Sequence, residues 1–197
     1  MRKEAQVERC GWAGSEQIYV DYHDTDWGVP EYDSRALWEK LVLDGFQAGL
    51  SWITILKKRD NFRSAFSGFD PDVIATWSEP EVRRLLQDPG IVRHRGKIEA
   101  TIGNAQAWQR LERDKGFDRF LWDYVGGKPI QNRWRDMSEV PAFTPLSQQI
   151  SRDLKKAGFR FCGPTIVYAF MQAVGMVNDH LVTCPRHAEV AKLGVST

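Results

Sequence analysis

The 197-residue sequence predicts an all-α protein. No convincing stretch alternates apolar and polar residues, as half-buried strands would. Instead, Val167, Phe170 and Val174 follow the helical spacing i, i+3 and i+7. Helix start signals also recur, most clearly in Ser78-Glu-Pro-Glu81, which has the form of a capping box. These features indicate packed amphipathic helices.

The chain begins with a polar tail, residues 1–8. The segment from Cys10 to Pro30 has no sustained period, and we expect a structured loop with short turns of helix. Asp70-Pro71 predicts a helix start, with an N-cap followed by proline at the first helical position. The expected helices cover residues 34–44, 51–65, a segment starting at 71, 78 to about 88, 91–114, 117–125, 145–156 and 163–174. We assign residues 126–144 to a loop and residues 188–197 to a C-terminal tail.

Composition and charge limit the function classes. The net charge of +1 gives no global basic field, so any nucleic-acid site must be a local patch. No run of about eighteen apolar residues exists, so we expect no membrane span. The N-terminus lacks the apolar core of a signal peptide. Three distant cysteines argue against a disulfide scaffold and for a reducing compartment, and we expect a cytoplasmic location.

The most apolar run of the chain, residues 41–56, contains one acid, Asp44. A carboxylate within a core-like segment is rarely buried without a partner. If Gly45 ends the preceding helix, Asp44 lies in the last turn, where the helix dipole disfavours negative charge. A group with two unfavourable features is a candidate for function. The alternative is that Asp44 reaches solvent or caps the next helix.

Four residues from the two ends of the chain could bind zinc. His180 and Cys184 are four residues apart, and Cys10 and His23 lie near the N-terminus. Two thiolates and two imidazoles complete a tetrahedral zinc site with no open position, which is typical of a structural site. His187 is a rival ligand. The alternative is that the four are unrelated buried thiols and surface histidines.

A helical hairpin near residue 160 could bind DNA. One helix ends at Gly158, and Gly163 opens the next, whose unpaired N–H groups can face an anion. The basic side chains of Lys155, Lys156 and Arg160 surround the turn, which gives a local phosphate-binding patch. The turn is similar to the helix-hairpin-helix motif of DNA repair proteins. The alternative is an ordinary helical hairpin with solvated lysines.

Several longer motifs together resemble the type I 3-methyladenine DNA glycosylases, from about residue 8 to 184. They are Glu8-Arg-Cys-Gly-Trp12, Tyr22-His-Asp, Trp27-Gly-Val-Pro30, Gln47-Ala-Gly-Leu-Ser-Trp52, Leu56-Lys-Lys-Arg59, Arg93-His-Arg-Gly-Lys-Ile98 and Asn178-Asp-His180. The resemblance implies an all-α helix-hairpin-helix glycosylase, with residues 9–187 forming one domain of two lobes. It implies one structural zinc on Cys10, His23, His180 and Cys184, and a base pocket of Trp12, Tyr19, Tyr22, Trp52 and the carboxylate at 44. It also implies that Gly49 and Leu50 form the loop that plugs the gap left in the duplex.

The implied activity is excision of 3-methyladenine from double-stranded DNA, and we expect a monomer, the default for an enzyme that wraps a duplex. An N3-alkylated adenine in DNA is cationic and already a good leaving group. The enzyme must flip it, bind it against the electron-rich rings and Asp44, and position a water. The product would be an abasic site without strand cleavage, and the absence of lysine from residues 41–56 agrees with this.

Two positions depart from the family pattern. Members carry a glutamate at the position of Asp44, and a glutamine is expected at Phe46. A paralogue with shifted base specificity and a non-catalytic protein that binds damaged DNA are therefore alternatives. A zinc-stapled interaction module that binds no DNA is a third. We do not assign Asp179 a catalytic role, because it is adjacent to His180 of the implied zinc site.

Overall fold

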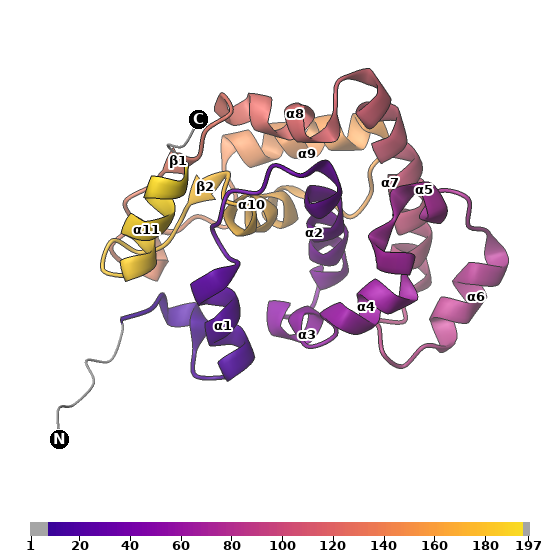
Figure 1. The fold of residues 1–197 in the computed structure, drawn as a ribbon, viewed down its shortest axis with the longest axis horizontal. Helices are drawn as coiled ribbons and strands as arrows, with labels where there is room; N and C mark the ends of the chain where they lie inside the picture. Colours follow the sequence, from indigo (N-terminus) through magenta and orange to yellow (C-terminus); the bar gives the residue numbers. More distant parts are fainter. Residues whose placement is uncertain (1–7, 195–197) are drawn as a thin grey trace.

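The computed structural model describes residues 8–194 as a mostly helical protein, which confirms the predicted fold class at that level (Figure 1). The α-helices are α1 (Gln17–Thr25), α2 (Ser34–Gln47), α3 (Trp52–Leu56), α4 (Arg59–Ala65), α5 (Pro71–Ile74), α6 (Glu79–Gln87), α7 (Arg95–Asp114), α8 (Phe117–Trp122), α9 (Pro145–Ala157), α10 (Pro164–Ala173) and α11 (Pro185–Leu193). The 3-10 helices are η1 (Gly11–Ala13), η2 (Ser67–Phe69), η3 (Asp123–Val125) and η4 (Met137–Glu139), and the strands are β1 (Ile130–Gln131) and β2 (Val177–Asn178).

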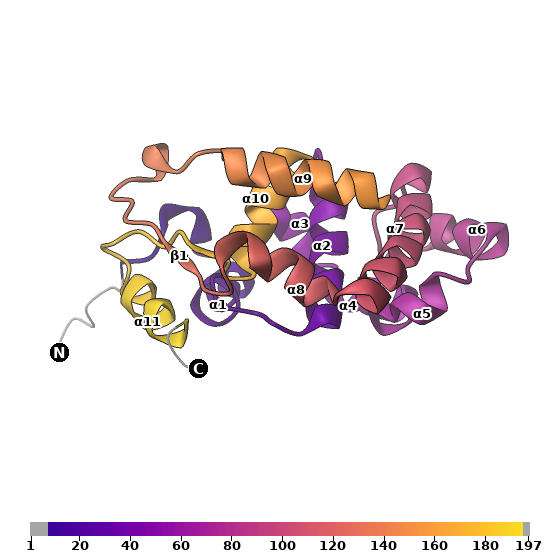
Figure 2. The same ribbon diagram turned by 90° about the horizontal axis from the view of Figure 1, so that it is seen from above.

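Helix α2 lies in the middle of the molecule and packs against α3, α7, α8 and α10. Its side chains from Leu37 to Phe46 supply much of the hydrophobic core. Helices α5 and α6 lie at one end, and α1, α11 and the two strands lie at the other (Figure 1, Figure 2). Segments from near both termini therefore lie at the same end of the molecule.

Local capping explains several helix starts. The Asp70 carboxylate accepts a hydrogen bond from the Asp72 backbone N–H at 2.9 Å, and Pro71 takes the first helical position of α5. Ser78 and Glu81 form the predicted capping box, in which the Ser78 backbone N–H donates to the Glu81 carboxylate at 2.8 Å. These predicted starts are confirmed.

The predicted end of the central helix at Gly45 is wrong, because α2 continues to Gln47. Gly45 serves close packing instead. A Cβ atom at this position would lie 3.3 Å from the Phe161 carbonyl oxygen. The Lys97 ammonium then donates to the carbonyl oxygens of Phe46 at 2.8 Å and Ala48 at 2.6 Å. It thereby satisfies the last carbonyl groups of α2.

Other segments also differ from the prediction. The helix expected over residues 51–65 is two helices, α3 and α4, which meet at Lys58, where ψ is 2°. The Lys58 ammonium donates to the Pro89 carbonyl oxygen at 3.0 Å and ties this break to a distant loop. Strands β1 and β2, which the sequence did not predict, pair in parallel but have two residues each, too few for an alternating pattern.

Both ends of the domain are more regular than predicted. Helix α1 occupies part of the expected loop from Cys10 to Pro30. Helix α11 includes residues 188–193 of the expected tail, and its Val190 is buried. Residues 1–7 of the polar tail and residues 195–197 lie outside the described residues.

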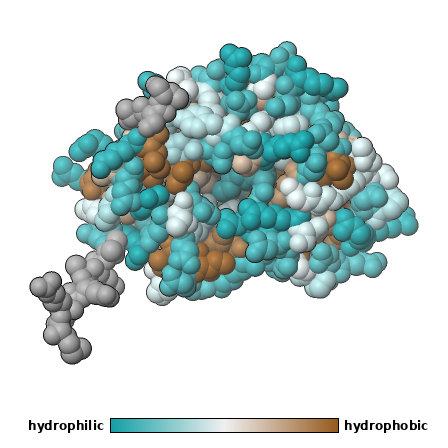
Figure 3. Space-filling view, viewed as in Figure 1, coloured by the Kyte–Doolittle hydropathy of each residue, from teal (hydrophilic) through white to brown (hydrophobic). Residues whose placement is uncertain are grey.

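The surface seen in Figure 3 is mostly hydrophilic, with hydrophobic side chains exposed in separate small areas. Between residues 8 and 194, the structure contains no helix with both the length and the hydropathy needed to cross a membrane.

Candidate functional site

A cavity of about 340 Å³ lies between α1, α2, α3, α10 and the loop from residue 137 to 142. Its wall is largely aromatic and aliphatic, with a few polar groups, which is the usual character of a small-molecule site. The lining residues are Trp12, Tyr19, Tyr22, Trp27, Lys40, Asp44, Gln47, Trp52, Met137, Val140, Pro141, Ala142, Thr165, Tyr168, Ala169, Gln172, Ala173 and Asp179. All five residues that the family resemblance assigned to a base pocket line this cavity.

The Trp12 ring packs edge to face against two neighbours, with ring centroids 5.1 Å from Tyr19 and 4.9 Å from Trp27. The rings of Tyr22 and Trp52 are tilted by 44° to each other, with centroids 5.4 Å apart. These contacts fix the orientation of each ring. Burial raises the pKa of Tyr22 well above its ordinary value, so its phenol is neutral. The cavity therefore presents a rigid aromatic wall to a flat ligand.

Asp44 is buried in this wall and forms an ion pair with Lys40, one helical turn before it. The Lys40 ammonium lies 2.5 Å from Asp44 Oδ1 and 3.8 Å from the centroid of the Trp52 ring. Among residues 8–194, Asp44 Oδ2 has no hydrogen-bond partner. Burial raises the pKa of Asp44 and lowers that of Lys40, and the attraction between them opposes both shifts. The sequence reading missed Lys40, which lies one residue before the apolar run.

Asp179 is a buried carboxylate in the same wall, and its two oxygen atoms accept four hydrogen bonds. Oδ1 accepts from Asn132 Nδ2 at 2.6 Å and from Trp134 Nε1 at 2.8 Å. Oδ2 accepts from the Tyr168 hydroxyl at 2.6 Å and from Gln172 Nε2 at 2.8 Å. Asp179 thus joins the loop that carries the cavity residues 137–142 to helix α10. The sequence reading did not detect this role.

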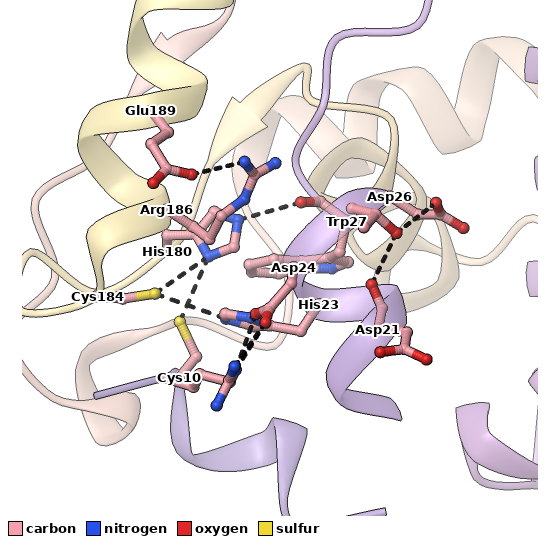
Figure 4. A network of polar contacts seen from close by, with 12 residues as sticks. Cys10, Asp21, His23, Asp24, Asp26, Trp27, His180, Cys184, Arg186 and Glu189 are labelled. Atoms are coloured by element: carbon pink, nitrogen blue, oxygen red, sulfur yellow. Dashed lines mark hydrogen bonds and ion pairs between the residues drawn. The ribbon is translucent and has the colours of Figure 1, made fainter. Parts of the chain in front are cut away.

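Cys10, His23, His180 and Cys184 converge on one point between α1 and the start of α11 (Figure 4). All four are buried, and their ligand atoms lie within 4.8 Å of one another. The nitrogen–sulfur distances are 3.6 Å from His180 to Cys10, 3.7 Å from His23 to Cys184 and 3.8 Å from His180 to Cys184. Tetrahedral bonds of the usual zinc lengths place such atoms roughly 3.5 Å apart, so the residues fit a tetrahedral metal site.

The outer ring nitrogens of both histidines are also held. His23 Nδ1 lies 2.7 Å from the Asp24 carboxylate, and His180 Nε2 lies 3.1 Å from the Trp27 carbonyl oxygen. Such partners orient histidine ligands in metal sites. Arg9 in turn holds Asp24 at 2.7 Å.

The neighbouring Cys10 thiol, with His180 and His23, lowers the pKa of Cys184, and the proximity of Cys184 together with burial raises the pKa of Cys10. The rival ligand His187 is not one of the four residues that converge, and its Nε2 atom instead lies 2.8 Å from the Asn132 carbonyl oxygen.

The backbone at Gly28 packs directly against His180. A Cβ atom at position 28 would lie 2.9 Å from His180 Nε2.

Helices α9 and α10 form the predicted hairpin. Gly158 ends α9 in the left-handed conformation, and Gly163 is the N-cap of α10. The Asn104 side chain holds the turn from behind, because it accepts from the Arg160 backbone N–H at 2.8 Å and donates to the Arg160 carbonyl oxygen at 3.0 Å. The turn is therefore preformed.

The basic side chains of the hairpin face solvent. Lys155, Lys156 and Arg160 are exposed. Lys156 pairs with Asp153 at 3.0 Å, whereas Lys155 and Arg160 have no acidic partner within residues 8–194. Two basic groups next to the N-terminus of α10 are thus available to an anion.

The segment between α2 and α3 carries an exposed apolar tip beside the cavity. Gly49 has a φ angle of +80°, and the next side chain, Leu50, is 43% exposed. Asp44, Gln47 and Trp52 of the cavity wall flank this segment. An apolar tip beside a pocket can enter a base stack.

Comparisons with known proteins agree on one family. A family model described as methyladenine glycosylase matches residues 12–187. DNA-3-methyladenine glycosylase 1 of Escherichia coli is 51% identical over 179 residues, which cover 90% of this chain and 96% of that protein. A crystal structure of 3-methyladenine DNA glycosylase I is similar with a TM-score of 0.89 and 50% identity, covering 90% of this chain and 98% of the other. A variant of such an enzyme in complex with 3-methyladenine has a TM-score of 0.87 and 40% identity, covering 89% and 95%.

Proposed function

Because this chain belongs to the methyladenine glycosylase family, we propose that it is a DNA repair enzyme that releases 3-methyladenine from alkylated DNA. The observation that carries the proposal is the aromatic cavity with one buried carboxylate, Asp44, in its wall. A flat cation gains from electron-rich ring faces and from a desolvated negative charge. An N3-alkylated adenine in DNA is such a cation.

Trp12, Tyr19, Tyr22 and Trp52 supply the ring faces in this proposal, and Asp44 supplies the acceptor. The free oxygen of Asp44, Oδ2, would accept a hydrogen bond from the edge of the flipped base. Each good cation–π contact stabilises the bound base by about 0.5–2 kcal/mol. Neutral adenine gains less from every one of these contacts, which gives discrimination.

Bond cleavage needs no acid, because the cationic base leaves as a neutral molecule. The N-glycosyl bond breaks with its electron pair leaving on the base, and positive charge develops on the sugar. A water molecule then adds to the sugar carbon and loses a proton, so the products are the free base and an abasic site. The charge of Asp44 near the developing sugar cation stabilises that charge separation.

DNA would be held outside the cavity by the hairpin of α9 and α10 and by the segment between α2 and α3 that carries Gly49 and Leu50. Backbone N–H groups at Gly163, with Lys155, Lys156 and Arg160, would bind phosphates without reading sequence, and Gly158 lets the backbone approach. Leu50, with Gly49 before it, would fill the space left by the flipped base.

We further propose that Cys10, His23, His180 and Cys184 bind one zinc ion with a structural role. Four protein ligands leave no position for water or substrate. When bound, the ion joins the N-terminal segment, which carries Trp12, to the C-terminal segment, which carries Asp179. The proposal is supported by the nitrogen–sulfur distances and by the held outer nitrogens.

The test is release of free bases from methylated DNA, resolved by chromatography. We expect 3-methyladenine from the wild type, and excision by Asp44→Asn reduced by on the order of tenfold or more, with weaker binding of the base. Asp44→Glu, run alongside, restores the side-chain length of the family glutamate. If Asp44→Glu releases 3-methyladenine and the wild type does not, the protein is a paralogue with another substrate. If neither protein releases 3-methyladenine, the result would indicate a protein that only binds DNA.

A further inference from the structure

We propose that Lys40 is a specificity-determining residue of the base pocket, because its ammonium competes with a cationic base for Asp44 and for the face of Trp52. By this competition it lowers the preference of the pocket for cationic over neutral bases. The inference rests on the proposed function only in assigning the cavity to a purine base.

The position of the Lys40 side chain carries the argument. Its ammonium lies 2.5 Å from Asp44 Oδ1 and 3.8 Å from the centroid of the Trp52 ring, and the side chain is only 16% exposed. These are the same two features that would attract a cationic base, a buried carboxylate and an electron-rich ring. In the free protein, both already bind a cation.

The charge of the cavity wall supports this view. Lys40, Asp44 and Asp179 are the charged residues in the wall of the cavity. Both oxygen atoms of Asp179 already accept two hydrogen bonds each, so Asp44 is the carboxylate left for a base, and Lys40 is paired with Asp44. A cationic base that enters therefore faces a paired carboxylate and a nearby positive charge, whereas a neutral base loses nothing to charge repulsion.

A second cavity of about 290 Å³ offers the ammonium an alternative position. Tyr22, Lys40 and Trp52 line both cavities and form part of the wall between them. Apart from Lys40, the charged residues of the second cavity are three carboxylates and two guanidinium groups, Asp26, Glu31, Glu39, Arg59 and Arg63.

One of the three carboxylates of the second cavity forms no ion pair with the two guanidinium groups. Arg59 pairs with Asp26 at 2.8 Å, and Arg63 pairs with Glu39 at 2.7 Å. Glu31 has no lysine or arginine partner within residues 8–194. A rotation of the Lys40 side chain about its own torsions would move the ammonium into this acidic space and free Asp44 for the base.

The test measures binding of two free bases to the full chain at pH 8 by isothermal titration calorimetry. The probes are 3,9-dimethyladeninium, a permanent cation, and 3-deaza-3,9-dimethyladenine, its neutral isostere. For Lys40→Met, we expect the cation to bind more tightly by on the order of tenfold, and the neutral isostere to change by less than about twofold. Lys40→Arg keeps the charge and should retain the wild-type ratio.

Lys57→Met is the matched control, because Lys57 makes an exposed ion pair with Glu16 away from the cavity. It should leave both affinities unchanged. Lys40→Gln removes the charge but can still donate to Asp44, so it repeats the test if the methionine variant does not fold. Thermal unfolding and zinc content establish that each variant is intact.

The proposal is overturned if removal of the charge weakens or leaves unchanged the binding of the cation, or if the neutral isostere gains as much. It is also overturned if wild type and Lys40→Met bind neither probe. The outcome is independent of turnover: a wild type that releases no 3-methyladenine but shows the expected binding ratios would refute the proposed function and support the role of Lys40.

Discussion

Replacement of Asp179 by asparagine should destabilise the protein and disturb the cavity wall. Asp179 joins two elements that are far apart in sequence, the loop at residues 132–134 and helix α10. The substitution conserves shape and removes the charge and one acceptor oxygen. Any effect therefore measures the hydrogen bonds rather than the packing.

The expected magnitude follows from the four donors. Asparagine keeps one acceptor oxygen, and the Trp134 indole can only donate, so that oxygen must face Trp134 and Asn132. The new NH₂ group then faces Tyr168 and Gln172, which must turn to accept. A hydrogen bond to a charged group contributes about 1.5–3 kcal/mol, and with partial recovery we expect a loss of about 2–4 kcal/mol in the free energy of unfolding.

Denaturant unfolding at pH 7 measures this loss, and zinc content shows whether the neighbouring His180 is still in place. We expect excision to fall as well, because Gln172 and Tyr168 line the cavity. Asp153→Asn is the control, since that carboxylate accepts from the Tyr124 hydroxyl at the surface, and its loss should be much smaller. An unfolding free energy of Asp179→Asn within about 0.5 kcal/mol of wild type would refute the reasoning.

Three further predictions address the metal group, the pocket lysine and a surface ion pair. Purified protein should contain one zinc ion per chain by metal analysis. His180→Ala should lose the zinc, whereas His187→Ala should keep it. A full equivalent of zinc in the His180 variant would show that His180 is not a ligand. The wild type should leave abasic DNA uncleaved and give no borohydride-trapped adduct, because Lys40, the one lysine in the cavity wall among residues 8–194, is held in an ion pair with Asp44. A trapped adduct that disappears in Lys40→Met would reveal a lyase. Hydrogen bonds from Arg95 and then Arg83 lower the pKa of Glu79 to about 2. The contribution of the Glu79 ion pairs to stability should therefore be present above about pH 4.5 and lost as the pH falls toward 2. The melting temperatures of Glu79→Gln and wild type should converge over that pH range, and a constant difference would contradict this prediction.

The features that could be predicted from the sequence depend on residues close together in the chain. The capping residues Asp70 and Ser78 act within three residues of themselves, so their positions in the sequence are enough to predict the helix starts. The same holds for the glycines that bound the hairpin. The end of α2 was different, because Lys97 supplies its cap from a helix more than fifty residues away.

The roles of the polar groups of the cavity could not be predicted from local sequence either. A lysine four residues before an acid normally forms a solvated pair on a helix surface, so nothing local marked Lys40 as a buried group. Asp179 was set aside because it is adjacent to His180, but neighbouring residues outside a helix can point in opposite directions. Its four donors come from separate parts of the chain, and only the folded structure brings them together.

The resemblance contributed what local patterns could not. The aromatic residues Trp12, Tyr22 and Trp52 come from three separate segments, yet all line one cavity. Their role in binding a base stays a prediction until the excision assay is done.

The pairing of early and late segments has a consequence for biosynthesis. Cys10 approaches His180 and Cys184, and Gly28 donates a backbone hydrogen bond to Ala173. A ribosome that has made the first fifty residues has therefore produced four of the aromatic rings of the cavity, but not the segment that orders them. The early segment must wait until residues 173–184 emerge, which delays these contacts in folding. Fragments released before residue 180 would lack a finished cavity, so only a chain that extends past residue 184 could bind a damaged base.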